Sequence, residues 1–278
     1  MKSLFDEISI SCSKLMTRKY STSFSLGISF FSEKYRGPIY SIYSFVRLAD
    51  EIVDSFHDYD KELLLRQFKI GAQDAIQNRI SINPIFNAFQ EVFHKYNFET
   101  SLLDQFLNSM SMDLQKQEHT EETYKAYIYG SAEVVGLMCL RVFTEGDDKM
   151  YESLKPDAMK LGSVFQKVNF LRDIRADYEQ LGRTYFPGVD LNNFSANDKK
   201  RIEDDIEKEF AESLDGIRKL PRGARSGVYL AYLYYKKLFN KIKRLPPGYV
   251  MKKRIRISNG RKVGLMLHSM LRLRFNLL

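Results

Sequence analysis

Residues 169–177, NFLRDIRAD, place acidic side chains at helical spacing among apolar ones. In a helix, Asn169, Asp173 and Asp177 would lie on one face because they are four residues apart. The remaining surface is mostly apolar, formed by Phe170, Leu171 and Ile174. A helix that is apolar almost all round is a buried helix. Carboxylates in such a setting need a cation or a bound ligand.

A second helix of this kind is predicted in YSIYSFVRLADEIVDSF, residues 40–56. Asp50 and Asp54 are four residues apart, and Tyr43 and Arg47 fall on the same line at helical steps. About one such aspartate pair is expected by chance in a chain of this composition, so either pair alone is a weak signal. Two pairs, each within an apolar helix, indicate a shared site.

The chemistry of the two pairs favours a divalent cation. Four facing carboxylates without partners would become protonated or force the fold apart. We expect magnesium, with manganese as the alternative metal, because magnesium takes oxygen ligands and bridges carboxylates to substrate phosphates. Arg47, Arg172 and Arg175 would then bind the phosphates. The alternative is that these arginines only neutralise the aspartates in structural salt bridges.

Such a site suits the departure of diphosphate from an allylic carbon. Magnesium and arginines stabilise the charge that develops on the leaving oxygens. The chain has 20 Phe, 17 Tyr and no Trp, and a cavity with aromatic walls would shield a carbocation from water. Packing in an ordinary core also explains most of these aromatic residues.

Helical periodicity dominates the chain, so we predict one all-α domain spanning residues 1–278. The seven prolines stand where helices could begin or end. Residues 180–195 form the longest irregular connection, which is either a functional lid or a passive connector. The expected helices cover residues 38–57, 60–77, 82–96, 99–116, 121–143, 149–179, 196–219, 222–244 and 260–275.

Cysteine and histidine positions argue against a zinc or haem site. The two cysteines and four histidines are scattered along the chain, at Cys12, Cys139, His57, His94, His119 and His268. The N-terminus carries Asp6 and Glu7 where a signal peptide would be apolar, and no apolar run approaches a membrane span. We expect a reduced cytoplasmic protein that is soluble or peripheral on the inner face of the membrane.

Charge is distributed unevenly along the chain. The net charge is +8, yet residues 216–278 contain 17 of the 43 Lys and Arg residues and none of the 35 Asp and Glu residues. This asymmetry indicates contact with an anion, such as a membrane surface, a phosphate-bearing ligand or a nucleic acid. A solvated basic face is the plainer alternative.

Residues 161–187, LGSVFQKVNFLRDIRADYEQLGRTYFP, resemble the second aspartate motif of the squalene and phytoene synthases, the head-to-head prenyl transferases. The first aspartate motif is matched by Arg47 and by DEIVD at 50–54, and STSFSLG at 21–27 resembles the substrate-contact segment. The resemblance covers almost the full chain. The matching positions of the second motif are Leu161, Gly162, Gln166, Asn169, Arg172, Asp173, Asp177, Arg183, Tyr185 and Pro187.

Residues 127–136, YIYGSAEVVG, resemble the tyrosine and small-residue motif of the same family, with two departures. Glu133 and Ile128 stand where smaller residues are usual. These departures leave the lining of the pocket open, but not the metal site.

The resemblance implies an isoprenoid synthase helical bundle with a central cavity, which joins two prenyl diphosphates head to head through a cyclopropylcarbinyl diphosphate. The metal would be held by Asp50, Asp54, Asn169, Asp173 and Asp177. Diphosphate would be bound by Arg47, Gln166, Asn169, Arg172 and Tyr185, and also by Lys253 or Arg254 of KKRIRIS, residues 252–258. The cavity near the cation would be lined by Tyr43 and Tyr129, and its other side by Ser21, Ser23 and Phe24.

The predicted activity is phytoene synthesis from two geranylgeranyl diphosphates, without NADPH and with a carotenoid desaturase as the downstream partner. Squalene or dehydrosqualene synthesis from farnesyl diphosphate is the alternative, since the residues do not measure cavity length. A terpene cyclase would also bind metal through aspartates, but it typically lacks the pattern at 166–187. A basic helical nucleic-acid binder would leave both aspartate pairs unexplained and set 35 acidic residues against phosphate, so no nucleic-acid partner is expected.

The last 18 residues, RKVGLMLHSMLRLRFNLL at 261–278, are basic and apolar. They are predicted to lie on a membrane surface, near a lipid substrate and product. An ordinary terminal helix that packs on the domain is the alternative.

Overall fold

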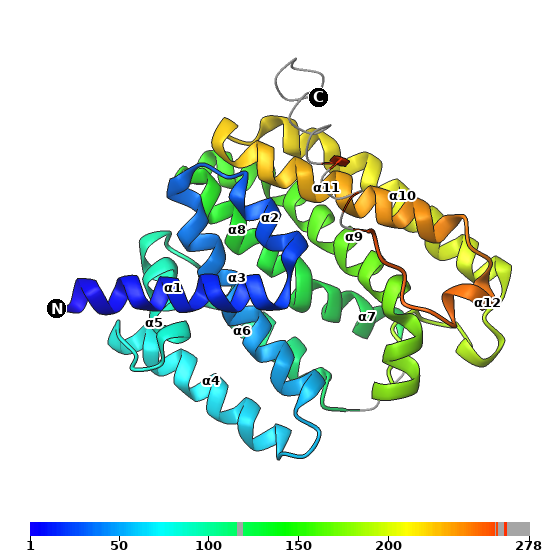
Figure 1. The fold of residues 1–278 in the computed structure, drawn as a ribbon, viewed down its shortest axis with the longest axis horizontal. Helices are drawn as coiled ribbons and strands as arrows, with labels where there is room; N and C mark the ends of the chain where they lie inside the picture. Colours follow the sequence, from blue (N-terminus) through cyan, green and yellow to red (C-terminus); the bar gives the residue numbers. More distant parts are fainter. Residues whose placement is uncertain (116–118, 259, 261–263, 266–278) are drawn as a thin grey trace.

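The computed structural model describes residues 1–115, 119–258, 260 and 264–265, and none of them forms a β-strand. The predicted all-α fold is confirmed (Figure 1). Of segment 261–278 and of the expected helix at 260–275, all but residues 260 and 264–265 lie outside the described residues. The helices are α1 Lys2–Tyr20, α2 Thr22–Ser29, α3 Glu33–Ser55, α4 Lys61–Asn78, α5 Pro84–Lys95, α6 Thr100–Met112, α7 Glu121–Ile128, α8 Val134–Thr144, α9 Asp148–Leu181, α10 Ala196–Lys219, α11 Arg222–Lys243 and α12 Pro247–Val250.

The prediction omitted helices α1 and α2, and it was wrong on the prolines and on one long helix. Pro38 and Pro156 lie inside α3 and α9 rather than at helix ends. Each proline removes one backbone hydrogen bond, but burial of the neighbouring side chains of Ile39 and Leu154 keeps the helices continuous. The segment predicted as one helix at 121–143 is divided by a π-helix, η1, at Tyr129–Glu133. A π-helical turn of this kind is frequently found at functional sites.

The core consists of two clusters of buried apolar side chains. The first surrounds Phe45 of α3, whose ring stacks on Phe89 at a centroid distance of 3.9 Å and contacts Phe68 and Phe106. The second lies between α9, α10 and α11 and includes the fully buried Phe210 and Phe239. Because α8 and η1 also pack on α9, that helix joins the two halves of the fold.

Close backbone approach positions η1 against α9. A Cβ atom on Gly162 would lie 2.7 Å from the carbonyl oxygen of Ala132 and 3.2 Å from the Cα of Glu133. Only glycine therefore lets α9 approach the π-helix at this depth. The contact positions α9 two helical turns before Asn169, the first polar residue of the stretch 169–177.

Beyond α12 the chain returns along α9 toward α11 in an extended segment, residues 252–258, which we call the C-terminal arm (Figure 1). Ile255 and Ile257 anchor the arm because both side chains are buried. Arg175 of α9 donates to the carbonyl oxygen of Lys252, and Lys241 of α11 donates to that of Arg256 at 2.8 Å. The arm thus lies against both helices.

One stretch, Glu121–Thr144, is long and apolar enough to cross a membrane by length and composition alone. It consists of α7, η1 and α8, and more than half of its apolar window is buried inside the protein. Core helices commonly show this pattern.

Candidate active site

Arg183 joins the end of α9 to one of the two predicted aspartate pairs, the pair on α3. Asp50 and Asp54 lie in the last two turns of α3, and Asp173 and Asp177 lie near the end of α9. Gly182 ends α9 with a positive φ of 65°, and the chain turns there. The Arg183 guanidinium then donates to Asp54 Oδ1 at 2.7 Å.

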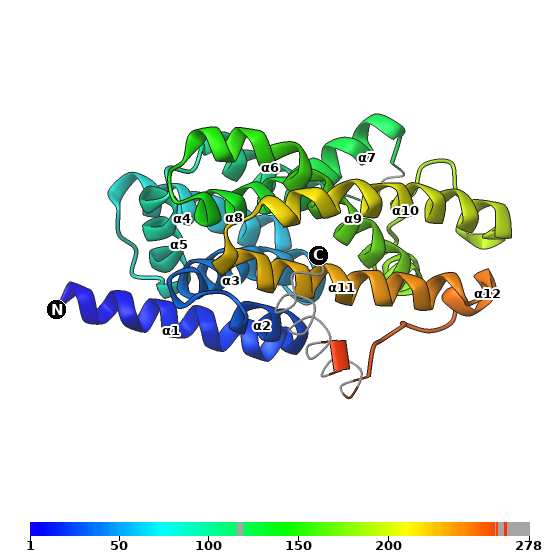
Figure 2. The same ribbon diagram turned by 90° about the horizontal axis from the view of Figure 1, so that it is seen from above.

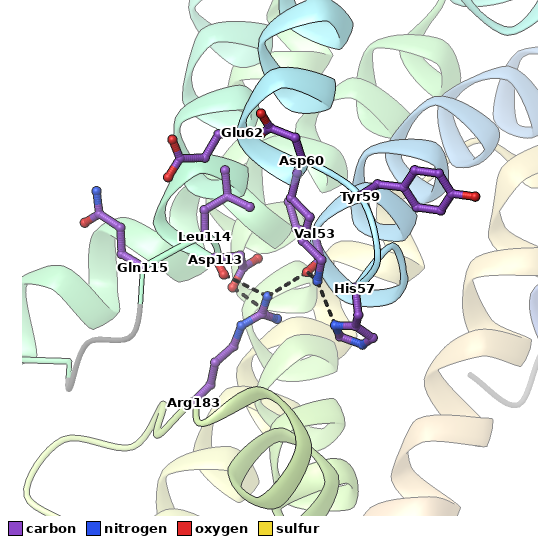
Figure 3. Close-up of a pocket in the computed structure, with 10 residues that line it drawn as sticks. Val53, His57, Tyr59, Asp60, Glu62, Asp113, Leu114, Gln115 and Arg183 are labelled. Carbon is purple, nitrogen blue, oxygen red and sulfur yellow. Dashed lines mark hydrogen bonds and ion pairs between the residues drawn. The ribbon is translucent and has the colours of Figure 1, made fainter.

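Asp113, the residue that caps the C-terminus of α6, holds the other side of Arg183. Arg183 donates to the Asp113 backbone oxygen at 2.9 Å and lies 3.4 Å from its carboxylate (Figure 3). The Tyr127 hydroxyl donates to both carboxylate oxygens, at 2.9 and 3.0 Å, and the Tyr185 hydroxyl donates at 3.5 Å. Stacking on Phe170, at 4.0 Å between centroids, fixes the Tyr185 ring. Tyr185 was predicted to orient diphosphate, and it lies in this buried network.

Sequence reasoning assigned no site role to Asp113 or Tyr127. Asp113 stands alone in MDLQ, without a second acidic residue at helical spacing, so the chain carries no local signal for it. Arg183 belonged to the matched motif and could have been assigned from that motif.

Negative charge exceeds positive charge at this site. Burial, and next the carboxylate of Asp54, raise the pKa of Asp50 to about 7. Burial, and next the carboxylate of Asp173, raise the pKa of Asp177 to about 7, with further contributions from Asp54 and Asp113. These contributions from α3 and α6 show that the two pairs lie within electrostatic range of each other.

This excess predicts a pH-dependent stability difference between the wild type and Asp50→Asn in EDTA. The folded protein holds a proton on Asp50 up to about pH 7, whereas the unfolded chain loses it near pH 4. Ionisation of Asp50 therefore destabilises the wild type increasingly from about pH 4 to pH 7, and the amide avoids this cost. We expect the stability of the variant relative to the wild type to increase by on the order of 2 kcal/mol between pH 5 and pH 8.

Urea unfolding at both pH values measures this difference. Magnesium added at pH 8 should raise the melting temperature of the wild type more than that of Asp50→Asn, because a cation compensates only the carboxylate. A stability difference that stays constant from pH 5 to pH 8 would contradict the charge assignment.

Asp173 is the contact point of two arginines. Arg172 donates to its Oδ1 at 2.9 Å, and Arg254 of the C-terminal arm lies 2.8 Å from the same oxygen. Both predicted arm residues are exposed, but of the two the structure pairs Arg254 with Asp173. Arg175 was expected to bind phosphate, but it pairs with Glu179 and the backbone of Lys252 instead. It therefore holds the arm in place.

Arg47 pairs with Glu51, one turn further along α3, and its guanidinium lies 4.6 Å from the centroid of the Tyr20 ring. Neighbouring Asp50 contributes a favourable charge to Arg47. The Nε atom of Arg47 is buried, and no described residue accepts a hydrogen bond from it. A buried guanidinium donor left open in this way suits an anionic ligand.

Two amide side chains of α9, Gln166 and Asn169, form a chain of polar contacts from η1 to α11. Gln166 lies 3.5 Å from the hydroxyl of Ser131 in η1, and Asn169 donates to Gln166 Oε1 at 3.4 Å. The Tyr235 hydroxyl of α11 donates to Asn169 Oδ1 at 3.3 Å. Tyr235 was absent from the predicted set.

The predicted cavity residues of α2 and α3 lie together. Phe24 and Tyr43 stack at 4.4 Å between centroids, and Ser21 caps α2. Burial raises the pKa of Tyr43 to about 12. Ser23 is half-buried on α2, and Tyr129 begins η1 beside the first core cluster.

A polar cavity of about 440 Å³ opens beside Arg183 (Figure 3). Lys61 stands in it, with its ammonium 2.9 Å from the carbonyl oxygen of Val53 and 3.1 Å from His57 Nδ1. Burial, and next the charge of Arg183, lower the pKa of Lys61. The lining residues are Val53, His57, Tyr59, Asp60, Lys61, Glu62, Asp113, Leu114, Gln115 and Arg183.

Magnesium requires oxygen ligands, and the carboxylates of the site are the candidate ligands. Across the described parts of the chain, no three His, Cys, Asp or Glu side chains converge as a metal-binding group. Magnesium commonly uses only one or two carboxylates and completes its shell with water and phosphate. The site offers carboxylate oxygens in pairs, and the raised pKa values of Asp50 and Asp177 indicate uncompensated acid. These residues therefore fit a magnesium ion that binds together with diphosphate.

The chain is an all-α bundle in which α3 and α9 each carry an aspartate pair, and Arg183, just after α9, contacts Asp54 of α3. The squalene/phytoene synthase family profile matches residues 17–261. The chain belongs to this family of prenyl transferases and is an enzyme of that class.

Individual relatives agree with this assignment. The chain is 28% identical to the 4,4'-diapophytoene synthase of Staphylococcus haemolyticus over 201 residues, which cover 71% of this chain and 67% of that protein. It is 25% identical to the phytoene synthase of Pseudescherichia vulneris over 275 residues, covering 89% and 86%. A crystal structure of a dehydrosqualene synthase in complex with ligand superposes with a TM-score of 0.84 over 97% of this chain and 98% of that one, at 23% identity. This likeness shows the shared fold.

Proposed function

We propose that the protein condenses two geranylgeranyl diphosphates head to head into phytoene, with release of diphosphate. The observation that supports this proposal is that each aspartate pair has an arginine partner, Arg183 at Asp54 and Arg172 at Asp173, in a chain of this family. Such a site compensates the charge of a departing diphosphate.

The residues of the chain would divide the work of diphosphate departure. Arg172 and Arg254, now paired with Asp173, would turn to the leaving oxygens once a cation compensates that carboxylate. Arg47 would contribute its open Nε donor. Gln166 and Asn169 would orient the diphosphate from the face of α9 that they share.

Magnesium, or manganese in its place, would be held by Asp50, Asp54, Asn169, Asp173 and Asp177. When bound, the metal supplies positive charge to the developing diphosphate. Tyr43, Phe24 and Tyr129 would present aromatic faces to the resulting cation and exclude water from it. The reaction to phytoene needs no reductant, so NADPH is not part of the proposal.

A second candidate is condensation of two farnesyl diphosphates into dehydrosqualene. The similarity to the diapophytoene synthase of S. haemolyticus, which is 28% identical, supports it. Either hydrocarbon would be consumed by a desaturase, which we propose as the downstream partner.

One assay separates the candidates. Purified full-length protein is incubated with magnesium and either geranylgeranyl or farnesyl diphosphate, with and without NADPH, and the extracted lipid is analysed by mass. A forty-carbon hydrocarbon formed without NADPH is the expected result. A thirty-carbon product would support the second candidate, and release of diphosphate without any coupled product would overturn both.

A further inference from the structure

Helix α1 and the region beside α11 carry exposed apolar and basic side chains that the proposed reaction does not use, and both lie on one side of the ribbon (Figure 1). Helices α1, α2 and α11 lie along this face, at the front of Figure 1 and the lower edge of Figure 2. Two features on it, one on α1 and one beside α11, have complementary chemistry.

The outward side of α1 carries an apolar stripe. Its buried side is formed by Ser9, Ser13 and Thr17. At about 100° per residue, Leu4, Ile8 and Leu15 point away from that side. Their exposed fractions are 60%, 47% and 59%. The exposed residues Arg18 and Lys19 follow the stripe at the end of the helix. We call Leu4, Ile8 and Leu15 the α1 stripe.

The second feature is a groove of about 900 Å³ beside α11, which we call the α11 groove. Leu233, Leu245 and Ile257 supply apolar surface, and four basic residues stand around it. No carboxylate belongs to its described lining. The lining residues are Leu233, Lys236, Lys237, Asn240, Lys241, Arg244, Leu245, Ile257, Gly260, Gly264 and Leu265.

The cations of the groove are poorly compensated. Lys237 and Arg244 are exposed, and within the described part of the chain no carboxylate forms an ion pair with either. Lys236 lies over the Phe210 ring at 4.8 Å; burial lowers its pKa, and the Glu207 carboxylate acts in the opposite direction. Of the basic residues nearby, Lys243 has an acidic partner, Glu207. The groove therefore presents a net positive charge to solvent.

We propose that the α1 stripe and the α11 groove form a docking surface for an anionic phospholipid bilayer. The basic residues match the phosphate headgroups, and the apolar surfaces match the acyl region directly beneath them. This pairing selects a membrane over a nucleic acid, since a polyphosphate backbone would leave the exposed Leu and Ile side chains without a partner. Exposed apolar residues that cluster on one face commonly mark such contacts.

The docking surface also connects to the candidate active site. Ile257 of the groove and Arg254, which pairs with Asp173, belong to the same C-terminal arm. Lys241 binds the backbone of this arm at Arg256. A bilayer on this face would therefore lie against the segment that links the groove to the aspartate pairs.

Vesicle sedimentation of the full-length protein tests the proposal through binding alone, independently of the reaction. The wild type should sediment with phosphatidylcholine vesicles that contain phosphatidylglycerol, and only weakly with pure phosphatidylcholine. Lys237→Gln/Arg244→Gln should weaken partitioning about 30-fold, because each basic residue near an anionic membrane contributes about 1 kcal/mol. Ile8→Gln/Leu15→Gln should weaken it about tenfold or more through lost apolar contact.

The matched control is Lys125→Gln/Lys149→Gln, which removes the same charge from exposed positions on α7 and at the start of α9. It should sediment within a factor of about two of the wild type, as expected for charges outside the contact. Circular dichroism checks that each variant is folded. Hydrogen exchange with vesicles present should show protection in α1 and α11.

Three results would overturn the proposal. The first is equal sedimentation of the α11 variant and the control. The second is binding that is lost on removal of residues 266–278 while both surface variants bind normally, which would assign the contact to the terminal segment. The third is a wild type that binds an RNA homopolymer but does not bind vesicles, together with an α11 variant that does not bind the RNA.

Discussion

Asp173→Asn is expected to lower turnover at least about a hundredfold while leaving the helix content unchanged. Asp173 accepts from Arg172 and Arg254, and it is one of the residues proposed to hold magnesium. An amide keeps the size of the side chain but loses the charge that attracts the metal and holds both guanidinium groups. Asp54→Asn should behave similarly because Asp54 carries the contact to Arg183. Product formation per enzyme, measured over a magnesium titration, checks this prediction.

Asp215→Asn provides the matched control for this prediction. Asp215 pairs with Arg218 at 2.6 Å on the surface of α10, so the same chemical change occurs at an exposed ion pair. Such pairs contribute little, and we expect activity and stability close to those of the wild type. If Asp173→Asn kept its activity at low magnesium, its carboxylate would serve packing rather than the metal, and the site assignment would be wrong.

Long helical segments were predictable from the chain alone. Helix α10 begins and ends at the predicted residues 196 and 219, because Ser195 and Asp198 form a capping box in front of a periodic apolar face. Helix α9 was predicted at 149–179 and runs from Asp148 to Leu181, with Asp147 as its cap. In α10 the cap and the periodic apolar face agree, whereas α9 shows little overall periodicity and was predicted from its long run of helix-compatible residues.

Helices α1 and α2 were missed, and the reason is visible in their packing. Helix α1 turns the small polar residues Ser9, Ser13 and Thr17 toward α3 and α5, while Leu4 and Leu15 remain exposed. Its apolar pattern therefore identifies the outer side rather than the core. The Ser9 and Thr17 hydroxyls donate to backbone oxygens of their own helix, which satisfies them without a sequence signal.

The candidate site was predictable where its residues share a helix and unpredictable where they meet across the fold. Spacing along α3 and α9 identified the four aspartates. The role of Asp113 depends on the end of α6 facing the turn after α9, 70 residues away, where Arg183 binds its backbone. Periodicity within one element contains no information on such a contact.

Arg183→Gln is expected to be the most destabilising single change at the site. The side chain of Arg183 is 9% exposed and that of Asp113 is 6% exposed, so removal of the guanidinium leaves a buried carboxylate without its charge partner. Breaking a buried pair in this way costs about 3–5 kcal/mol. For a protein of this size the melting temperature should fall by roughly 10 °C. Urea denaturation of both proteins measures the loss directly.

Arg141→Gln is a control that removes an equally buried arginine from outside the site. Arg141 is 10% exposed and pairs with Glu99 and Asp148, but these carboxylates are 39% and 83% exposed. Water can solvate Asp148 fully and Glu99 in part after the substitution, so we expect a smaller loss of stability than in Arg183→Gln. Equal losses in the two variants would show that packing of the arginine stem, rather than buried charge, determines the cost.

A double-mutant cycle identifies the carboxylate responsible. If Asp113 is the acid that Arg183 compensates, Asp113→Asn should cost much less in the Arg183→Gln background than in the wild type, because the buried charge is then removed. The expected coupling is about 1–3 kcal/mol. Additive losses would instead indicate that Arg183 compensates the charge of Asp54, which is 36% exposed and can be solvated. Arg183 contacts both acids, so the cycle distinguishes two roles. Strong coupling would identify it as a fixed counter-ion for Asp113 on α6. Additive losses would identify it as the counter-ion of Asp54 on α3, which a bound metal must replace.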